Sequence, residues 1–219
     1  MSNSISNKKV LINLGGTYEP IDPIRGISNK SSGKMGLALA KEAYIRGADL
    51  TLIAAKCDVE IPSIFNTINV QTSSEMNDCI KSLIKDFDVF IATAAISDFE
   101  PIKMQSHKIN SSLNLSLEFK PVEKIIRQIK NISPDVFLVG FKAQYDISEN
   151  DLIDCANKQI EVAGSNLVVA NDLSHEGCGF GSDENEVILV RDNGTYEKIE
   201  LSSKTKLAEI IFDDIENSL

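Results

Sequence analysis

A long glycine-containing connection between a predicted strand and a predicted helix constrains this chain most. It runs from Gly15 to Gly36 as GGTYEPIDPIRGISNKSSGKMG, after the apolar run 10–14 and before the alanine- and leucine-rich stretch 37–43. The apolar run predicts a buried β-strand, and the following stretch predicts a helix. Strand-to-helix loops usually span about 2–6 residues, so a connection of this length indicates binding or catalysis. Free N–H groups at the helix N-terminus, beside glycines that admit a ligand to the backbone, predict an anion site; a structural glycine-rich turn is the alternative.

The two commonest phosphate-binding motifs are excluded by spacing. A P-loop requires Ser or Thr after its Gly-Lys pair, whereas Met35 follows Gly33 and Lys34 here. The dinucleotide fingerprint G-x-G-x-x-G is also absent from the sequence.

Composition narrows the class of protein. With 219 residues, 42% of them hydrophobic, the chain is long enough for one large α/β domain or two small ones. A net charge of −10 disfavours a nucleic-acid binder, although lysines gathered in one cleft would still bind phosphates. There is no run of 18 apolar residues and no apolar signal core in residues 1–7, so a cytoplasmic protein is expected. The four cysteines are scattered and only two histidines are present, which argues against a zinc site.

Strand and helix patterns alternate along most of the chain. The predicted strands cover residues 10–14, 50–55, 68–70, 88–95, 113–119, 136–141 and 167–170, and a hairpin joins 187–190 to 196–201 through Asp192–Asn193–Gly194. The predicted helices cover 37–43, 72–85, 122–131, 151–163 and 203–216. This order predicts an α/β fold: a three-layer, Rossmann-like, mostly parallel sheet with an antiparallel C-terminal edge. Residues 1–8 are expected to form a flexible N-terminus, and residues 9–219 a single domain.

Ligands of such sheets bind where the parallel strands end. Four segments follow predicted strands with small or polar residues, and we expect them to meet: Gly15–Gly33, Ala94–Asp98, Phe141–Gln144 and Ala170–Ser174. Asp98 is suited to a ribose or a cation, and an Asx-turn is its alternative role. The polar stretch 101–112 resembles a mobile flap carrying Lys103 and Lys108, which would supply charge to a bound phosphate.

Taken together, these segments resemble the phosphopantothenate–cysteine ligase (phosphopantothenoylcysteine synthetase) family. The resemblance rests on GGT-x-E-P-x-D-P-x-R-x-x-S-N-x-S-S-G-K-M-G, A-A-x-S-D-F, H-K-I-x-S-S, V-G-F and V-V-A-N-D, in the family's order and over nearly the whole chain. The flavin-dependent decarboxylase that many bacteria fuse to this ligase is not part of the sequence, so a stand-alone ligase is expected.

The resemblance implies a reaction and roles for individual residues. The carboxylate of 4′-phosphopantothenate would attack the α-phosphate of ATP or CTP, release pyrophosphate, and then react with the amine of L-cysteine; Mg²⁺ is implied by the triphosphate. Catalytic roles fall to Asn29, which would hold the acyl-phosphate carbonyl, and to Lys108, which would neutralise phosphate charge. The implied substrate-binding residues are Arg25, Ser31, Ser32, Gly33 and Ala95; the implied nucleotide-binding residues are Gly15, Gly16, Ala94, Asp98, Phe99, Phe141 and Lys158, with Asp98 also a candidate metal ligand.

Four further residues are weaker candidates. Lys34 is also compatible with a solvated position in the first helical turn, and Lys120 with simple strand alternation. Asn171 and Asp172 either cap the chain locally or line the cleft, and a structural role is favoured.

The sequence departs from the family at two places that bear on the nucleotide. The flap reads Lys108–Ile109–Asn110–Ser111, where many bacterial members have more lysines, and so resembles the ATP-using eukaryotic type. CTP-using bacterial members carry two lysines, four residues apart, in the helix before the V-A-N-D strand, where this chain has Gln159 and Ala163 beside Lys158. We therefore expect ATP to be used at least as well as CTP. A homodimer is implied by the resemblance, with the strand 113–119 as the expected contact.

Two other classes of function stay open at this point. A nicotinamide-dependent oxidoreductase of similar architecture is disfavoured because G-x-G-x-x-G is absent and Ala54–Ala55–Lys56, not an acidic residue, ends the second strand. A non-catalytic nucleotide-binding protein is disfavoured because Asn29, Asp98 and Lys108 are all present.

Overall fold

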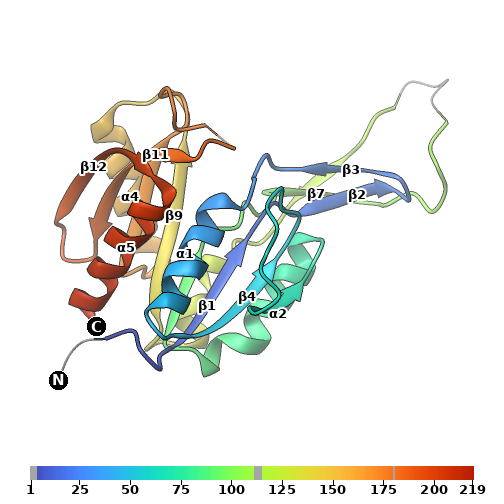
Figure 1. Ribbon diagram of the computed structural model, residues 1–219. Helices are drawn as coiled ribbons and strands as arrows, with labels where there is room; N and C mark the ends of the chain where they lie inside the picture. The colour runs from blue at the N-terminus through green and yellow to red at the C-terminus, as the bar shows by residue number, and fades with distance from the viewer. Residues whose placement is uncertain (1–3, 111–114, 180) are drawn as a thin grey trace.

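A twisted sheet forms the centre of the molecule (Figure 1). The computed structural model describes residues 4–110, 115–179 and 181–219. The strand order is β12-β11-β10-β9-β6-β1-β4-β5; the strands from β10 to β5 run parallel, and β11 and β12 are antiparallel. Their bounds are β1 Lys9–Leu14, β4 Asp49–Ala54, β5 Asn66–Asn69, β6 Val89–Ala92, β9 Phe137–Gln144, β10 Leu167–Asp172, β11 Glu184–Arg191 and β12 Tyr196–Ser203. The predicted fold class, including the antiparallel C-terminal edge, is confirmed.

Helices cover both faces of the sheet because the strands are apolar on both sides. Val10 and Ile12 of β1 pack in the cluster that holds α1 (Lys34–Ile45) and α5 (Lys204–Ser218). Leu11, on the opposite face of β1, packs in the cluster of α2 (Ser73–Leu83) and the 3-10 turn η1 (Ile84–Asp86). Further along that second face, α4 (Glu149–Ala163) packs on β10 and β11. Side chains alternate across a strand, so one strand serves both layers.

Local signals set several boundaries as the sequence predicts. Thr72 and Glu75 form a capping box at the start of α2, with the Glu75 N–H donating to Thr72 Oγ1 over 3.1 Å. Gly164 ends α4 in the left-handed conformation at φ 67°. Asp192–Asn193–Gly194 turns β11 into β12.

Two expectations differ from the structure in their local detail. The helix expected over 122–131 is broken into a 3-10 turn, η2 (Ile125–Arg127), and a single α-helical turn, α3 (Ile129–Ile132). The N–H groups of Arg127 and Gln128 donate to the carbonyls three residues before them, which closes a 3-10 turn in place of a continuous α-helix. Within the segment expected to be a flexible N-terminus, Ile5 is fully buried and its N–H donates to Glu216 Oε1 over 2.9 Å. Residues 1–3 lie outside the described part of the chain.

An arm projects from the body beside the carboxyl ends of the central strands (Figure 1). Its described residues are 18–28, 99–110 and 115–121, and it holds two antiparallel pairs. These are β2 (Tyr18–Asp22) with β3 (Arg25–Ser28), and β7 (Phe99–Pro101) with β8 (Phe119–Pro121).

In the arm, the structure differs from the strand expected over 113–119. Residues 113 and 114 lie outside the described residues, and of residues 115–119 only Phe119 belongs to a strand. Leu115 is exposed and Leu117 is only partly buried, so the alternation among the described residues has no core to cover and forms no long strand. Among the helices of the described residues, none is long and apolar enough to span a membrane.

Candidate active site

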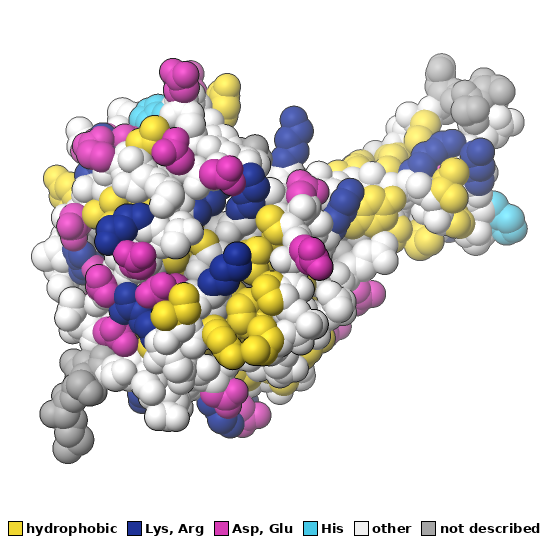
Figure 2. Space-filling view, viewed as in Figure 1, with side chains coloured by type: hydrophobic (Ala, Val, Ile, Leu, Met, Phe, Trp, Pro, Cys, Tyr) yellow, Lys and Arg dark blue, Asp and Glu magenta, His cyan; other side chains and the backbone are white. Residues whose placement is uncertain are grey.

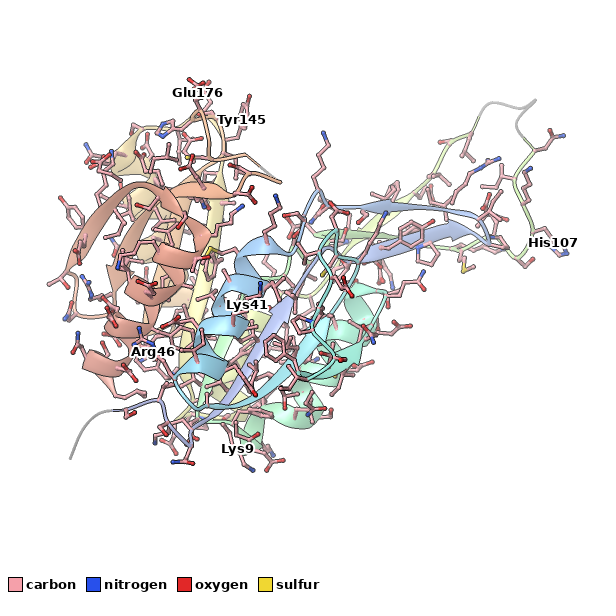
Figure 3. All side chains as sticks on the ribbon, in the orientation of Figure 1. Lys9, Lys41, Arg46, His107, Tyr145 and Glu176 are labelled. Atoms are coloured by element: carbon pink, nitrogen blue, oxygen red, sulfur yellow. The ribbon has the colours of Figure 1, made fainter. Side chains whose placement is uncertain are left out.

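The ends of four neighbouring parallel strands open onto one cavity. Strands β10, β9, β6 and β1 are adjacent in the sheet, so the segments that follow them meet at one edge. Figure 3 shows this polarity, with Lys9 at the start of β1 on one side of the molecule and Tyr145 and Glu176, in loops after β9 and β10, on the other. The cavity measures about 380 Å³, and its lining includes parts of all four predicted segments: 31–33, 94–98, 141–143, and 171 with 173. The expectation that these strand ends meet is confirmed.

The start of α1 forms one wall. Gly33 is left-handed at φ 78°, and a Cβ there would lie 2.8 Å from Cys57 Sγ, so glycine is required at this position. Ser32 is buried and its Oγ accepts the Lys34 N–H over 3.4 Å. Ser31, Ser32, Gly33 and Lys34 all line the cavity, which therefore faces the positive end of the α1 dipole.

Two lysines flank this wall. Lys34 Nζ lies 2.7 Å from Asp183 Oδ1 and also donates to the Gly181 carbonyl. Lys204, the first residue of α5, lines the cavity and donates to the Ser182 carbonyl. Burial lowers the pKa of Lys204, and the charge of Lys34 lowers it further, while Asp183 acts in the opposite direction.

The end of β6 is held by polar side chains from other elements. Asn13 Oδ1 accepts the Ala94 N–H over 3.0 Å, and Thr17 Oγ1 accepts the Ser97 N–H over 2.9 Å. Asn29 Nδ2 donates to the Ile96 carbonyl over 3.2 Å and contacts the Ala95 carbonyl at 3.5 Å. The structure thus brings Asn29 together with Ala95. Ala94 and Ala95 line the cavity, and Asn29 lines a second, polar hollow that adjoins it.

Asp98 lies at the mouth of the cavity. Its side chain is exposed and forms an ion pair with Lys124, with the nitrogen and oxygen 3.1 Å apart. Phe141, within β9 (Phe137–Gln144), also lines the cavity. Asp98 and Phe141 are therefore both placed where a ligand in the cavity would meet them.

Gln159 of α4 also lines the cavity, whereas Lys158 and Ala163 do not. The Gln159 Nε2 atom is buried and has no hydrogen-bond partner among the described residues. A Cβ at Gly140 would lie 2.1 Å from that atom, so the amide packs directly on the β9 backbone. Gln159 and Ala163 are the two positions expected to differ from CTP-using members of the family, and of these only Gln159 lines the cavity.

Three of the predicted residues that do not line this cavity lie on the arm. Arg25, Phe99 and Lys108 are all absent from the cavity lining. Figure 3 labels His107 at the far end of the arm, away from the body, and Lys108 is the next residue. Lys108 is exposed in this position.

Gly15 and Gly16 are also outside the lining. Both are buried, and a Cβ on Gly15 would lie 2.6 Å from the Lys56 carbonyl oxygen, while one on Gly16 would lie 2.7 Å from that of Asn29. Their positions favour close backbone packing behind the cavity, and the predicted contact with a nucleotide stays a prediction.

Comparison with known proteins places the chain in a family. The model of the DNA/pantothenate metabolism flavoprotein C-terminal domain matches residues 5–219. The chain belongs to this family. Among curated relatives, the coenzyme A biosynthesis bifunctional protein CoaBC of Thermococcus kodakarensis is 49% identical over 99% of this chain and 53% of its own length. The chain thus spans about half the length of the curated relatives it matches.

Solved structures agree with the family assignment. The C-terminal domain of a CoaBC protein superposes with a TM-score of 0.82 at 27% identity, covering 100% of this chain and 98% of that domain. A Cab2 variant shares the fold, with a TM-score of 0.77 at 19% identity and coverage of 97% and 87%. The family resemblance predicted from the strand-end motifs is confirmed.

In this chain, a magnesium ion would have to depend on the substrate for most of its ligands. Among the described residues, no three His, Cys, Asp or Glu side chains are grouped to hold a metal. Asp98 places one carboxylate at the cavity. That arrangement fits Mg²⁺, which is commonly bound through one or two carboxylates together with substrate phosphates.

The structure adds cavity residues that sequence reasoning missed, among them Lys124, Cys178, Asn185 and Lys204. Lys204 begins the C-terminal helix and Asn185 lies on antiparallel β11, so neither follows a parallel strand. Only the pairing of β11 with β10 brings them to this edge of the sheet. Asn171 lines the cavity, which is one of the two roles expected for it. Asp172 accepts hydrogen bonds from the N–H groups of Asp146, Ile147 and Ser174, so it has the expected structural role.

Proposed function

We propose that this domain joins 4′-phosphopantothenate to L-cysteine through an acyl-nucleotide intermediate, in the synthesis of coenzyme A. The observation that carries the proposal is the single cavity in which the N-terminus of α1, the Ala94–Ala95 strand end and Phe141 meet, with Asn29 against its edge. The names of the curated relatives support it. So does the Cab2 variant, whose structure holds phosphopantothenate-cysteine, the product of this reaction.

In the first step a carboxylate oxygen of phosphopantothenate attacks the α-phosphorus, and the bond to pyrophosphate breaks. Such transfers are catalysed mainly by position and by neutralisation of charge. The free N–H groups of α1, with Ser31 and Ser32, face the anion, and Lys34 and Lys204 lie beside them. A magnesium ion, held by Asp98 and the phosphates, would neutralise further charge when bound.

In the second step the amine of cysteine attacks the acyl carbon. The carbon–oxygen bond to the nucleotide breaks, the nucleoside monophosphate leaves with the electron pair, and the amine loses a proton. Negative charge gathers on the acyl oxygen as the bond forms. The Asn29 amide is suited to donate to it, because its contact with the Ala95 carbonyl, at 3.5 Å, is at the limit of a hydrogen bond.

The proposal includes a homodimer in which the arm of one copy serves the cavity of the other. The arm is rich in exposed hydrophobic side chains, as the space-filling view shows (Figure 2), including Ile24 at 60%, Phe99 at 57% and Ile102 at 56% exposed. Apolar patches of this kind mark interaction surfaces. Because Lys108 is carried away from its own cavity, a second copy is the partner that gives this lysine a substrate.

Mixing two inactive variants tests the shared site. Asn29→Asp would remove the amide donor, and Lys108→Gln would remove the lysine. A mixed dimer contains one site with both intact residues, so random exchange restores up to about a quarter of parental activity. No recovery on mixing, with exchange shown by tagged chains, would overturn the shared site and leave the reaction itself standing.

The reaction is tested by release of pyrophosphate. The purified protein, supplied with ATP or CTP and magnesium, is expected to release pyrophosphate only when 4′-phosphopantothenate is present, and to form phosphopantothenoylcysteine once cysteine is added. Release of orthophosphate instead, or turnover that does not depend on phosphopantothenate, contradicts the acyl-nucleotide mechanism.

A further inference from the structure

The buried carboxylate of Asp22 connects the two chain segments that make up the arm. Asp22 ends β2 and is 1% exposed, although its neighbours Pro23 and Ile24 are exposed. A charged side chain is rarely buried this completely unless its oxygens are satisfied. The hydrogen-bond donors around Asp22 therefore show which parts of the chain this carboxylate connects.

Both oxygens of Asp22 are occupied, and they face different parts of the chain. Oδ1 accepts the N–H groups of Ile24 and Arg25, each over 2.9 Å, and so closes the turn between β2 and β3. Oδ2 accepts the N–H of Ile109 over 3.1 Å and lies 3.8 Å from the guanidinium of Arg25. Ile109 belongs to the flap and directly follows Lys108.

A second backbone contact fixes the same piece of flap. The Gln105 N–H donates to the carbonyl of Ile21, the residue before Asp22, over 2.8 Å. Lys108 therefore lies between two attachment points on β2. The exposed lysine side chain is then free to move while its Cα is held in place.

The charge on Asp22 persists at neutral pH. Burial raises the pKa of this carboxyl, but the N–H groups of Ile24, Ile109 and Arg25, together with the Arg25 charge, lower it more, so the pKa is below its ordinary value. An ionised carboxylate offers only acceptors, which matches three N–H groups and a guanidinium.

We propose that Asp22 is a positioning residue for Lys108: it holds the flap against the β2–β3 turn so that the lysine is presented to the phosphates of a bound substrate. The inference rests on the proposed function, because Lys108 acts only if the reaction is the one proposed. Since Arg25 is held by the same carboxylate, the turn and the flap keep a fixed relation to one another.

Asp22→Asn tests this with little change of shape. The amide keeps one acceptor, but its NH₂ group would face an N–H donor of the turn or of Ile109, so one of those contacts is lost. Glu118→Gln, an exposed carboxylate on the same arm, is the matched control. Asp22→Ser is the second variant, since its hydroxyl still accepts from the turn but is too short to reach Ile109.

Two measurements separate positioning from a general loss of structure. Displacing a reacting group by about 1 Å costs on the order of 100-fold in rate, so kcat is expected to fall by roughly 10- to 100-fold in Asp22→Asn and not in Glu118→Gln. If Asp22 acts through Lys108, adding Asp22→Asn to Lys108→Gln changes kcat by less than about threefold, because the position of an absent lysine no longer matters. Full additivity of the two effects would overturn the proposal.

Hydrogen exchange provides a readout that does not depend on turnover. The amide of Ile109 is expected to exchange at least about tenfold faster in Asp22→Asn and Asp22→Ser than in the parent or in Glu118→Gln, because its acceptor is weakened or removed. Unchanged exchange overturns the attachment itself. Faster exchange with unchanged kcat overturns the positioning role, whereas failure of the parental protein to release pyrophosphate would overturn the proposed function and not the attachment.

Discussion

Gly36→Ala should destabilise the protein, although the same change in most helices stabilises it. Gly36 is the third residue of α1 and is buried against β1. A Cβ there would lie 2.5 Å from Leu14 Cβ and 2.6 Å from Thr93 Oγ1, well inside van der Waals contact. Leu14 is fully buried in the sheet, and Thr93 Oγ1 is held by its hydrogen bond to the Asn13 carbonyl. Neither atom is the free end of a flexible side chain, so the helix itself must move.

The magnitude follows from two opposing contributions. Replacing glycine by alanine inside a helix contributes up to about 1 kcal/mol of stability. Overpacking a close-packed core costs about 1–3 kcal/mol of stability. Because the new Cβ would collide with both Leu14 and Thr93, we expect a cost in the upper half of that range. The net loss is about 1–2 kcal/mol. A protein of this size loses about 2–4 °C of Tm per kcal/mol, so Tm should fall by about 2–8 °C.

Thermal unfolding followed by circular dichroism measures this directly. Gly179→Ala is the matched control, because a Cβ at Gly179 meets nothing within 4 Å, and its Tm should change little. Displacement of α1 would also shift Ser32 and Gly33, so KM for the triphosphate should rise in Gly36→Ala. A raised Tm for Gly36→Ala would show that helix propensity outweighs the contact with β1, and would refute this account of the glycine.

Three further predictions address the site and its support. Lys108→Gln should lower kcat/KM by about 10²–10³ with an unchanged Tm, because an exposed residue contributes little to stability; activity within about threefold of the parent would contradict a catalytic flap. ATP should serve at least as well as CTP in side-by-side kcat/KM measurements, since the uncharged Gln159 lines the cavity where the family resemblance implies a lysine in CTP-using members; a preference for CTP of about 100-fold or more would refute this. Burial raises the pKa of Asp172, but the N–H groups of Ser174, Ile147 and Asp146 lower it more, to well below its ordinary value. The stability that Asp172 contributes is therefore present above its unfolded pKa, near 4, and is lost as the pH falls further. The Tm of the parent should thus exceed that of Asp172→Asn by less and less between about pH 5 and pH 2. A Tm difference that stays constant over this range would contradict the prediction.

The elements that sequence alone predicts well are those whose signals are local. The capping box at Thr72 and the left-handed Gly164 each depend on a few adjacent residues, and both appear as predicted. Long apolar runs such as 167–170 likewise identify buried strands whatever their neighbours are. The meeting of four strand ends follows from the parallel topology, so that part of the site was also predictable.

The arm was not predictable in the same way. The β2–β3 hairpin reads as a polar loop because its pattern is interrupted by prolines and glycine, and Asp22 is satisfied partly by Ile109, 87 residues further along the chain. The leucine alternation of 113–119 indicates a strand only if a neighbouring surface covers one face. Lys204 reaches the cavity because an antiparallel edge returns the chain to it, a contact that no local spacing encodes.

The charge of the cavity differs from that of the whole chain. The protein carries a net charge of −10, yet among the described lining residues four lysines, Lys34, Lys124, Lys142 and Lys204, face two acidic side chains, Asp98 and Glu123. A concave site with an excess of positive charge concentrates anions whatever the net charge of the chain. Asp183, outside the lining, offsets part of this charge by pairing with Lys34, whereas acidic residues more than about 10 Å away are largely screened at ordinary salt.

The ion pairs at the mouth of the cavity are suited to exchange for a ligand. Lys34 pairs with Asp183, whose side chain is 88% exposed, and Lys124 pairs with Asp98, which is 62% exposed. Exposed pairs of this kind contribute at most about 1 kcal/mol, so releasing a lysine from one costs little. A triphosphate offers each lysine a stronger acceptor in a more enclosed place. The exposed carboxylates thus keep the lysines at the cavity edge without competing strongly with the phosphates that the proposed reaction requires.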